Sequence, residues 1–188
     1  MGEVCEFRPK PYLDDLSNNM KVSFVPMADL GQNKMSFSIN TTKSIEEVKT
    51  GYTYFENGDV LLAKITPCFE NGKSGIAKNL KNNIGFGSTE FIVIRGDKQK
   101  IKPEWIYCII NSEKFLKLGA NNMTGSAGQR RVPIDFVTDY KIPLPSLADQ
   151  ERIVAALSEE QSIIAANERL IYLMQNKIDK TISRIYKK

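Results

Sequence analysis

The stretch that decides the fold of this chain is Lys141-Ile142-Pro143-Leu144-Pro145-Ser146-Leu147-Ala148-Asp149-Gln150-Glu151-Arg152-Ile153. Two prolines interrupt whatever structure precedes them, and a serine followed three residues later by an aspartate is typical of a helix start. From there to Tyr186 the sequence contains neither glycine nor proline. We therefore predict one long C-terminal helix that begins near Ser146.

Apolar residues recur along this helix at seven-residue intervals. The apolar members of the repeat are Ile153, Leu157, Ile164, Ile171, Met174, Ile178 and Ile185. Glu160, Asn167 and Thr181 take equivalent places, and polar residues in such a seam can set register. A seven-residue repeat keeps one face toward a partner helix, so these residues are the predicted interface of a coiled coil or helical hairpin.

The partner of this helix is not evident in the chain, because no internal repeat encodes a second copy of the same domain. About 40 residues at about 1.5 Å each form a rod of about 60 Å, longer than a domain of this size can cover. A second copy of the chain is one way to bury the apolar face. The alternative is a helix that lies across its own domain.

The 188 residues, of which 41% are hydrophobic, divide into one predicted domain at residues 1–145 and the helix at residues 146–188. Within 1–145 the pattern favours short strands interrupted by glycines, with small helices between them. The expected strands are residues 22–25, 36–39, 60–65, 75–77, 85–88 and 90–94, and the expected helices are 44–49, 103–110 and 113–118, the last ending at Gly119. This predicts an α+β domain built on a strongly bent, largely antiparallel sheet.

Composition disfavours several kinds of enzyme. The sequence has no histidine, which removes the commonest general base and metal ligand, and its three cysteines are widely separated. A metal-dependent nuclease using Asp59, Glu70 and Lys73 lacks the required spacing, and the Gly85-x-Gly87 pair lacks the third glycine of a dinucleotide site. We expect a protein without catalysis of its own.

The first candidate binding segment carries lysines, a threonine and an asparagine on and after the strand at 60–65. Its residues are Lys64, Thr66, Asn71, Lys73 and Lys78. Such side chains can bind phosphates and contact base edges. Lysines and amides also occur on the solvated loops of any protein, so this segment alone does not decide between the two.

The second candidate segment is Gln129-Arg130-Arg131, which follows a loop rich in glycine and serine. Guanidinium groups form paired hydrogen bonds with phosphate or guanine, and glutamine matches adenine. The alternative is a structural role, in which an arginine caps helix 113–118 or pairs with Asp135 or Asp139. The net charge of +4 is mild, so nucleic-acid binding would depend on a local patch.

No apolar run approaches the roughly 20 residues that cross a bilayer, and the first residues lack the order of a secretory signal. We expect a cytoplasmic protein with no membrane partner.

Four segments resemble the specificity subunit of type I restriction-modification systems. They are GDVLLAK at 58–64, GSTEF at 87–91, GSAGQRRV at 125–132, and IPLP followed by QERIV within 142–154. The last, where a target-recognition domain leads into its long helix, is the most specific. The resemblance covers nearly the whole chain.

The resemblance implies a fold and a mode of action. Family members usually carry two target-recognition domains and two long helices that pair antiparallel, whereas this chain has one of each. It therefore resembles a half-subunit that acts as a homodimer, with each domain recognising one half of a split site in double-stranded DNA. A twofold dimer would recognise an inverted repeat.

The resemblance also implies partners and assigns the chemistry to them. In the family, a modification subunit methylates adenine with S-adenosylmethionine, and a restriction subunit cleaves DNA with ATP. This chain is then expected to hold no cofactor. The alternatives are a coiled-coil adaptor that does not contact DNA and a regulatory truncated subunit.

Overall fold

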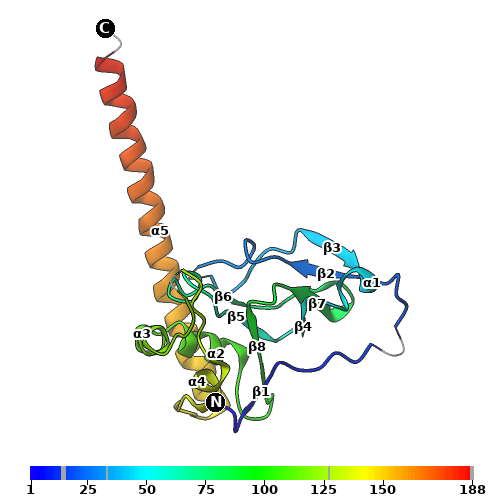
Figure 1. Ribbon diagram of the computed structural model, residues 1–188. Helices are drawn as coiled ribbons and strands as arrows, with labels where there is room; N and C mark the ends of the chain where they lie inside the picture. The colour runs from blue at the N-terminus through cyan, green and yellow to red at the C-terminus, as the bar shows by residue number, and fades with distance from the viewer. Residues whose placement is uncertain (14–15, 33, 127, 187–188) are drawn as a thin grey trace. The chain divides into compact units, whose positions relative to one another are not determined.

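The computed structural model describes the chain in four stretches, residues 1–13, 16–32, 34–126 and 128–186. It divides into two compact units, Met1–Gln150 and Glu151–Lys188. The first unit holds two β-sheets and the short helices, and the second is the long helix α5 (Leu147–Ile185) beyond its first turn (Figure 1). This α+β organisation, with a long C-terminal helix, confirms the prediction.

The first sheet is antiparallel throughout. Its strands are β1 (Cys5–Phe7), β5 (Val60–Ala63), β6 (Ser74–Ile76) and β8 (Phe91–Gly96), in the order β1-β8-β5-β6. Leu61 of β5 lies opposite Val93 of β8, and all residues of β5 are buried. The predicted strand at 60–65 is therefore one of the two central strands of this sheet.

The second sheet is mixed. Its strands are β2 (Lys21–Val25), β3 (Thr41–Ser44), β4 (Thr53–Glu56) and β7 (Ile84–Gly87), in the order β3-β2-β7-β4. Strands β2 and β7 run parallel, with Phe24 opposite Phe86, and the other pairs are antiparallel. Instead of the one bent sheet that the glycines suggested, the chain forms two sheets, because β7 pairs with β2 and β4 while β8 pairs with β1 and β5.

A hydrophobic core joins the two sheets. Val25 and Phe55 from the second sheet and Leu61 and Val93 from the first belong to one cluster of fully buried side chains. Burying each such side chain contributes about 1.5–3 kcal/mol. The two sheets are thereby held as one unit.

The turn before β5 is fixed by a buried carboxylate. Gly58 has a φ of 93°, in the left-handed region that favours glycine. Asp59, only 1% exposed, accepts two hydrogen bonds of 2.7 Å from the guanidinium of Arg95 and one of 2.7 Å from the Glu56 amide. Because a buried charge must be paired, Asp59 serves the fold.

Four short helices and one 3-10 turn complete the first unit. They are α1 (Ile45–Val48), the turn η1 (Lys81–Asn83), α2 (Pro103–Ile110), α3 (Glu113–Asn121) and α4 (Ile134–Asp139). Helices α2, α3 and α4 gather at the opposite end of the unit from α1 and β3 (Figure 1). At the start of α1 the Ser44 amide donates to the Glu47 carboxylate at 2.7 Å, and at the start of α3 Ser112 Oγ accepts from the Phe115 amide at 3.3 Å.

The predicted start of α5 is confirmed in detail. Ser146 Oγ accepts a hydrogen bond from the Asp149 amide at 3.2 Å, as an N-cap residue does. Gln150 is fully buried, and its amide group donates to the carbonyls of Lys100 and Pro145. The Trp105 indole donates to the Pro143 carbonyl at 3.0 Å. The proline segment and the first turn of α5 therefore belong to the first unit.

The predicted strand at 36–39 is wrong. Only an isolated bridge between Ser36 and Ile76 forms there. Phe37 and Ile39 pack against the core as partly buried side chains, and an added Cβ on Gly75 would lie 2.7 Å from the Phe37 ring. The alternation that suggested a strand thus belongs to an irregular segment that places its apolar side chains on the core.

The strands β1, β3 and β4, the turn η1 and the helix α4 were not predicted. The aromatic pair Tyr54-Phe55 was a usable signal for β4, since aromatic residues favour strands. Helix α4 is short and contains β-branched residues of low helix propensity, and β1 has only three residues. These two depend on tertiary contacts.

Gly119 does not end α3, as the sequence suggested, but lies inside it. An added Cβ at Gly119 would lie 2.2 Å from the ring of Phe69 and 3.1 Å from that of Phe136. Phe69 is fully buried and packs 6.0 Å, between ring centroids, from Phe115. The glycine is needed for close approach.

The Gly119→Ala variant tests this packing, because helix propensity and the close approach of Phe69 predict changes of opposite sign in the free energy of unfolding. Helix propensity alone would stabilise the variant by about 1 kcal/mol. The clash with Phe69 is expected to outweigh it and to destabilise the domain by about 1–3 kcal/mol. Urea unfolding gives the difference, with Lys117→Ala on the exposed face of α3 as the control. A stabilised Gly119→Ala variant would contradict this account.

Candidate nucleic-acid interface

The two basic segments predicted from the sequence lie side by side. The Thr66 amide donates to the Arg130 carbonyl and the Val132 amide to the Lys64 carbonyl, both at 2.9 Å. Arg131 forms antiparallel bridges with Ile65 and with Thr124. Backbone pairing thus places Lys64, Thr66 and the 129–131 segment together at the end of β5.

Each arginine of this segment faces a carboxylate. Arg131 donates from Nε and Nη2 to the Glu90 carboxylate, with the shortest distance 2.8 Å, and Arg130 Nη2 lies 3.5 Å from Glu70 Oε1. The structural alternatives weighed from the sequence, a cap on α3 or pairing with Asp135 or Asp139, are not what these ion pairs show. Both arginines remain about half exposed.

The Arg131–Glu90 pair changes the titration of the carboxyl group. The hydrogen bond from Arg131 lowers the pKa of Glu90 below its ordinary value of 4.5, against a smaller opposing effect of burial. Exposed ion pairs contribute little to stability, typically about 0–1 kcal/mol. The pair's effect is to orient the guanidinium while leaving part of its edge open.

Lys64 is held at the end of β5 by its hydrogen bond to the Thr89 carbonyl, at 2.8 Å. Burial lowers the pKa of its ammonium group, and the nearby charges of Arg8 and Arg131 lower it further, while Glu90 raises it. Burial is the largest of these effects, and charges of both signs act on the ammonium group.

The other predicted residues do not all lie beside Lys64 and the arginines. Lys73 Nζ donates to the Met27 carbonyl at 2.9 Å, and Lys78 forms an ion pair of 2.9 Å with Glu104. Asn71 is exposed, two residues before Lys73. Thr66 Oγ1 donates to Glu70 Oε1 at 2.8 Å, and the side chain of Gln129 is exposed. The structure thus brings together Lys64, Thr66, Gln129, Arg130 and Arg131 but directs the Lys73 and Lys78 ammonium groups away.

The residues weighed for a nuclease do not converge. Asp59 pairs with Arg95, Glu70 with Thr66 and Arg130, and Lys73 with a backbone carbonyl. Across the part of the chain that the structure describes, no three acidic or cysteine side chains are grouped to hold a metal ion.

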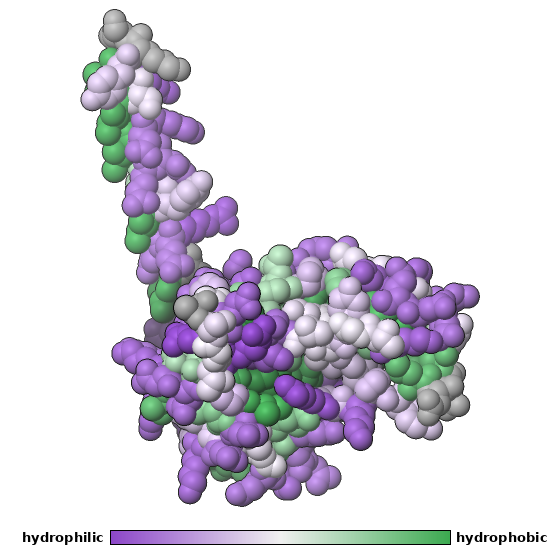
Figure 2. Space-filling view, viewed as in Figure 1, coloured by the Kyte–Doolittle hydropathy of each residue, from purple (hydrophilic) through white to green (hydrophobic). Residues whose placement is uncertain are grey.

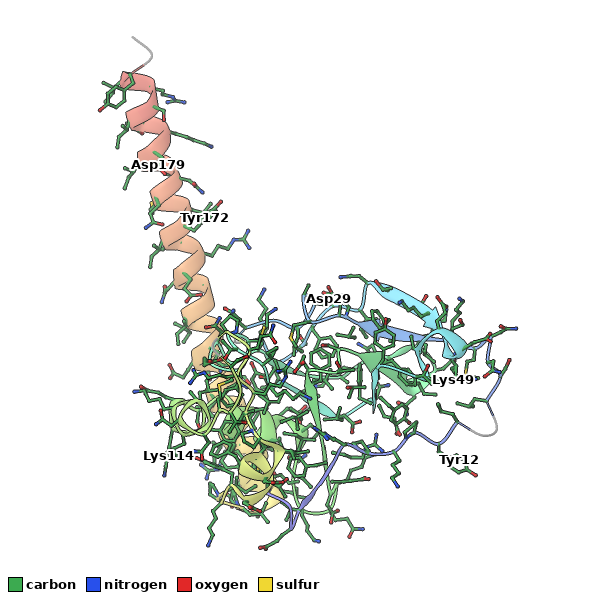
Figure 3. All side chains as sticks on the ribbon, in the orientation of Figure 1. Tyr12, Asp29, Lys49, Lys114, Tyr172 and Asp179 are labelled. Atoms are coloured by element: carbon green, nitrogen blue, oxygen red, sulfur yellow. The ribbon has the colours of Figure 1, made fainter. Side chains whose placement is uncertain are left out.

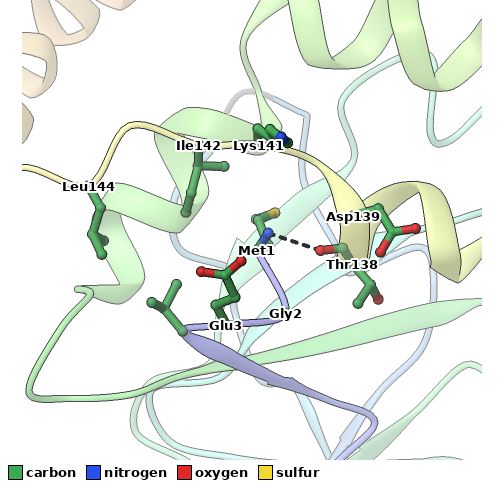
Figure 4. A pocket seen from close by; sticks show the side chains of 9 residues that line it. Met1, Gly2, Glu3, Thr138, Asp139, Lys141, Ile142 and Leu144 are labelled. Carbon is green, nitrogen blue, oxygen red and sulfur yellow. Dashed lines mark hydrogen bonds between the residues drawn. The ribbon is translucent and has the colours of Figure 1, made fainter.

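A separate pocket of about 800 Å³ lies beside Met1 (Figure 4). The amino group of Met1 donates to the carbonyls of Thr138 and Tyr140, at 2.9 and 2.7 Å. The pocket lining mixes Glu3, Asp139, Lys141 and Thr138 with apolar side chains. The two hydrogen bonds of the Met1 amino group hold the start of the chain against the end of α4.

Along α5, most side chains of the predicted seam are exposed. Leu157, Ile171 and Ile185 of the predicted seam are 42%, 58% and 69% exposed, and Ile164, Met174 and Ile178 are exposed as well, whereas Ile153 is half-buried. Ile182 extends the same face, and Figure 2 shows these apolar residues gathered along one side of the helix. Within the described stretches, none of the helices has the length and apolar character needed to span a bilayer.

The model of one protein family matches residues 1–173, from β1 into the second half of α5. Its description is type I restriction modification DNA specificity domain. The chain belongs to this family. The match includes both the basic segments and the first part of the apolar seam.

Two curated relatives are similar to this specificity domain. They are the specificity subunits of the type I restriction enzymes EcoAI and EcoEI from Escherichia coli, each 41% identical, over 163 and 159 residues. These cover 87% and 85% of the chain but 27% and 26% of the relatives. The chain therefore spans about a quarter of the length of each.

Solved structures share the fold. The HsdS subunit from Thermoanaerobacter tengcongensis matches with a TM-score of 0.71 and 20% identity, over 90% of this chain and 43% of that one. A chain from a study of complex assembly and conformational transition of the type I R-M system matches with a TM-score of 0.60 and 20% identity, over 89% and 38%. The specificity domain thus has the fold of known specificity subunits.

Sequence reasoning missed the carboxylate that orients Arg131. Glu90 lies in the GSTEF segment, 41 residues before Arg131, and no spacing rule links the two. It also missed Arg8 and Lys49, which only the packing of the two sheets brings toward Lys64.

The Arg131–Glu90 pair predicts a pH-dependent effect of Glu90→Gln. Because the folded pKa of Glu90 is lowered, its ionised form stabilises the fold above the unfolded value, and this contribution is lost as pH falls through the folded pKa. The variant should unfold at a lower temperature than the parent at neutral pH, and the gap should close as pH falls from the ordinary value of 4.5 through the lowered pKa. Thermal unfolding across pH measures this, with the exposed Glu159→Gln as control. A gap independent of pH would contradict it.

Proposed function

We propose that this chain recognises one half of a bipartite DNA site as a specificity subunit and acts as a homodimer paired through α5. The observation that carries the proposal is the family match over residues 1–173, which covers the basic segments and most of the apolar helix. DNA is the proposed ligand of the first unit. A second copy of the chain is the proposed partner of α5.

The exposed apolar face of α5 supports the homodimer. Its residues recur at heptad spacing, and pairing with a second α5 would remove them from water at about 25 cal/mol per Å². The 39 residues of the helix correspond to a rod of about 60 Å. In an antiparallel pair this length matches about 17 base pairs, enough to separate two half-sites.

The paired segments at 64–66 and 129–131 support DNA contact. Lys64, Arg130 and Arg131 present cations at one place, and Gln129 adds an amide that matches adenine. The carboxylates of Glu70 and Glu90 partly neutralise the arginines, which limits nonspecific attraction to phosphate. We assign Arg130 and Lys64 the main contacts.

Catalysis is assigned to partners. A modification subunit would methylate adenine with S-adenosylmethionine, and a restriction subunit would cleave DNA with ATP. The chain's own contribution is the choice of site and the spacing between half-sites.

A regulatory truncated subunit or a coiled-coil adaptor is the second candidate. The exposed apolar face of α5 favours considering it, since a coiled coil can hold partners without contacting DNA. DNA binding in the presence of the modification subunit separates an adaptor from a recognition subunit.

Mapping methylated adenines tests the function directly. Cells that carry this chain and its modification subunit are expected to methylate an inverted repeat with a fixed central spacer, because a twofold dimer presents two identical domains. Cells with the modification subunit alone are the control. An asymmetric site would overturn the homodimer, and the absence of added methylation would favour the regulatory alternative.

The dimer seam predicts different effects of two neighbouring substitutions. Ile171→Glu places a charge in the seam and should convert a dimer into monomers, as should Ile164→Glu. Leu173→Glu makes the same kind of change two residues away, about 200° around the helix, and should leave the dimer intact. Light scattering at micromolar concentration measures the mass. A monomeric parent protein, or equal dissociation by Leu173→Glu, would contradict the assignment.

A further inference from the structure

A second cationic site lies where the two sheets of the first unit meet. It is a pocket of about 440 Å³ whose walls come from the segment after β1, the end of α1, β4, and the ends of β5 and β7. Its lining residues are Arg8, Pro9, Pro11, Lys49, Tyr52, Thr53, Tyr54, Lys64, Phe86, Thr89 and Phe91. Only Lys64 among them was predicted from the sequence.

The charge of this pocket has one sign. Its described lining includes three cations, Arg8, Lys49 and Lys64, and no carboxylate. Lys49 Nζ donates to Asn18 Oδ1 at 3.1 Å and Lys64 Nζ to the Thr89 carbonyl at 2.8 Å, so both contact neutral oxygens. Among the described residues, Arg8 forms no ion pair. This contrasts with the 129–131 segment, where each arginine faces a glutamate.

The cations repel one another in the free protein. The charge of Arg8 adds to burial in lowering the pKa of Lys64, which shows that the two lie within electrostatic range. Glu90, which does not line the pocket, opposes this effect on Lys64. An anion bound between Arg8 and Lys64 would relieve the repulsion between the two cations. The pocket is therefore suited to an anion rather than to a neutral ligand.

The walls of the pocket are preorganised. Phe86 and Phe91 are almost fully buried, and Pro9 and Pro11 restrict the backbone of the segment that carries Arg8. Arg8 itself has a φ of 52°, and its amide donates to the Val93 carbonyl at 3.1 Å, which fixes the turn of the chain there. Tyr52, 39% exposed, leaves a hydroxyphenyl group at the rim.

The pocket adjoins the segment proposed to contact bases. Lys64 lines the pocket through its side chain, and its carbonyl accepts the Val132 amide at 2.9 Å. An extended polyanion could therefore contact the pocket and Arg130 at once. A phosphodiester backbone has this form, since phosphate contacts set the register of a protein on the duplex while other groups contact bases.

We propose that the pocket formed by Arg8, Lys49 and Lys64 binds a backbone phosphate of the DNA duplex and so positions the 129–131 segment over the bases. This rests on the proposed function and adds a sequence-independent contact to it. The contribution of Arg8 and Lys49 to the affinity for DNA is then the same whatever the DNA sequence.

The test is a pair of double variants of the full chain. Arg8→Gln with Lys49→Gln removes two charges from the pocket, and Lys114→Gln with Lys117→Gln removes two charges from α3. Figure 3 labels Lys49 and Lys114 at well-separated places on the first unit. Both double variants lower the net charge equally, so a general electrostatic effect is the same in each.

The measurement is the affinity for labelled mixed-sequence duplexes as a function of salt concentration. Loss of one phosphate contact should reduce the slope of log K against log salt by about 0.9, which corresponds to about eightfold weaker binding at about 0.1 M salt. The pocket variant should show this loss on every duplex tested. The α3 variant should match the parent.

The outcomes separate the two proposals. A parent protein that binds no duplex would defeat the proposed function, whereas a parent that binds while both double variants behave alike would overturn the pocket alone. Binding of inorganic phosphate by the parent, without loss of DNA affinity in the pocket variant, would assign the pocket to a free anion. Thermal unfolding checks the fold, and Lys49→Gln alone, at an exposed hydrogen bond, repeats the test with a smaller change.

Discussion

Backbone pairing between residues 64–66 and 130–132 is the interaction on which the basic surface depends. It joins the end of the central strand β5 to the loop between α3 and α4, through amide–carbonyl bonds of 2.9 Å at Thr66 and Val132. These bonds join backbone atoms only, so they can form whatever side chains the neighbouring residues carry. Such an arrangement suits a recognition surface, because the frame is rigid while the side chains that contact a ligand can change.

The charges on this surface are arranged in two different ways. Arg130 and Arg131 face glutamates, which orient the guanidinium groups and reduce their attraction to any polyanion. Arg8, Lys49 and Lys64 surround a pocket whose described lining holds no carboxylate. A duplex would thus meet strong, sequence-independent attraction at the pocket and weaker, directed contacts at the arginines, a division between positioning and recognition that many DNA-binding proteins share.

The long helix has a different physical requirement. Exposed apolar side chains recur along one face at heptad spacing, and apolar area of this kind is covered in most stable proteins. Its first turn is fixed to the first unit through buried Gln150 and the Pro143–Trp105 hydrogen bond. A defined start and an apolar face together make the helix suited to set a distance between two domains.

The sequence by itself determined the long helix and its start, the strand that becomes β5 and the family, because these depend on local chemistry and on patterns within a segment. Only the tertiary structure decided that the strands form two sheets, that Gly119 lies within α3 and that residues 36–39 form no strand. It also decided which cations act together. Glu90 forms an ion pair with Arg131, and Arg8 and Lys64 line the same pocket, although both pairs are far apart in the sequence. Only the packing of the sheets brings such residues together.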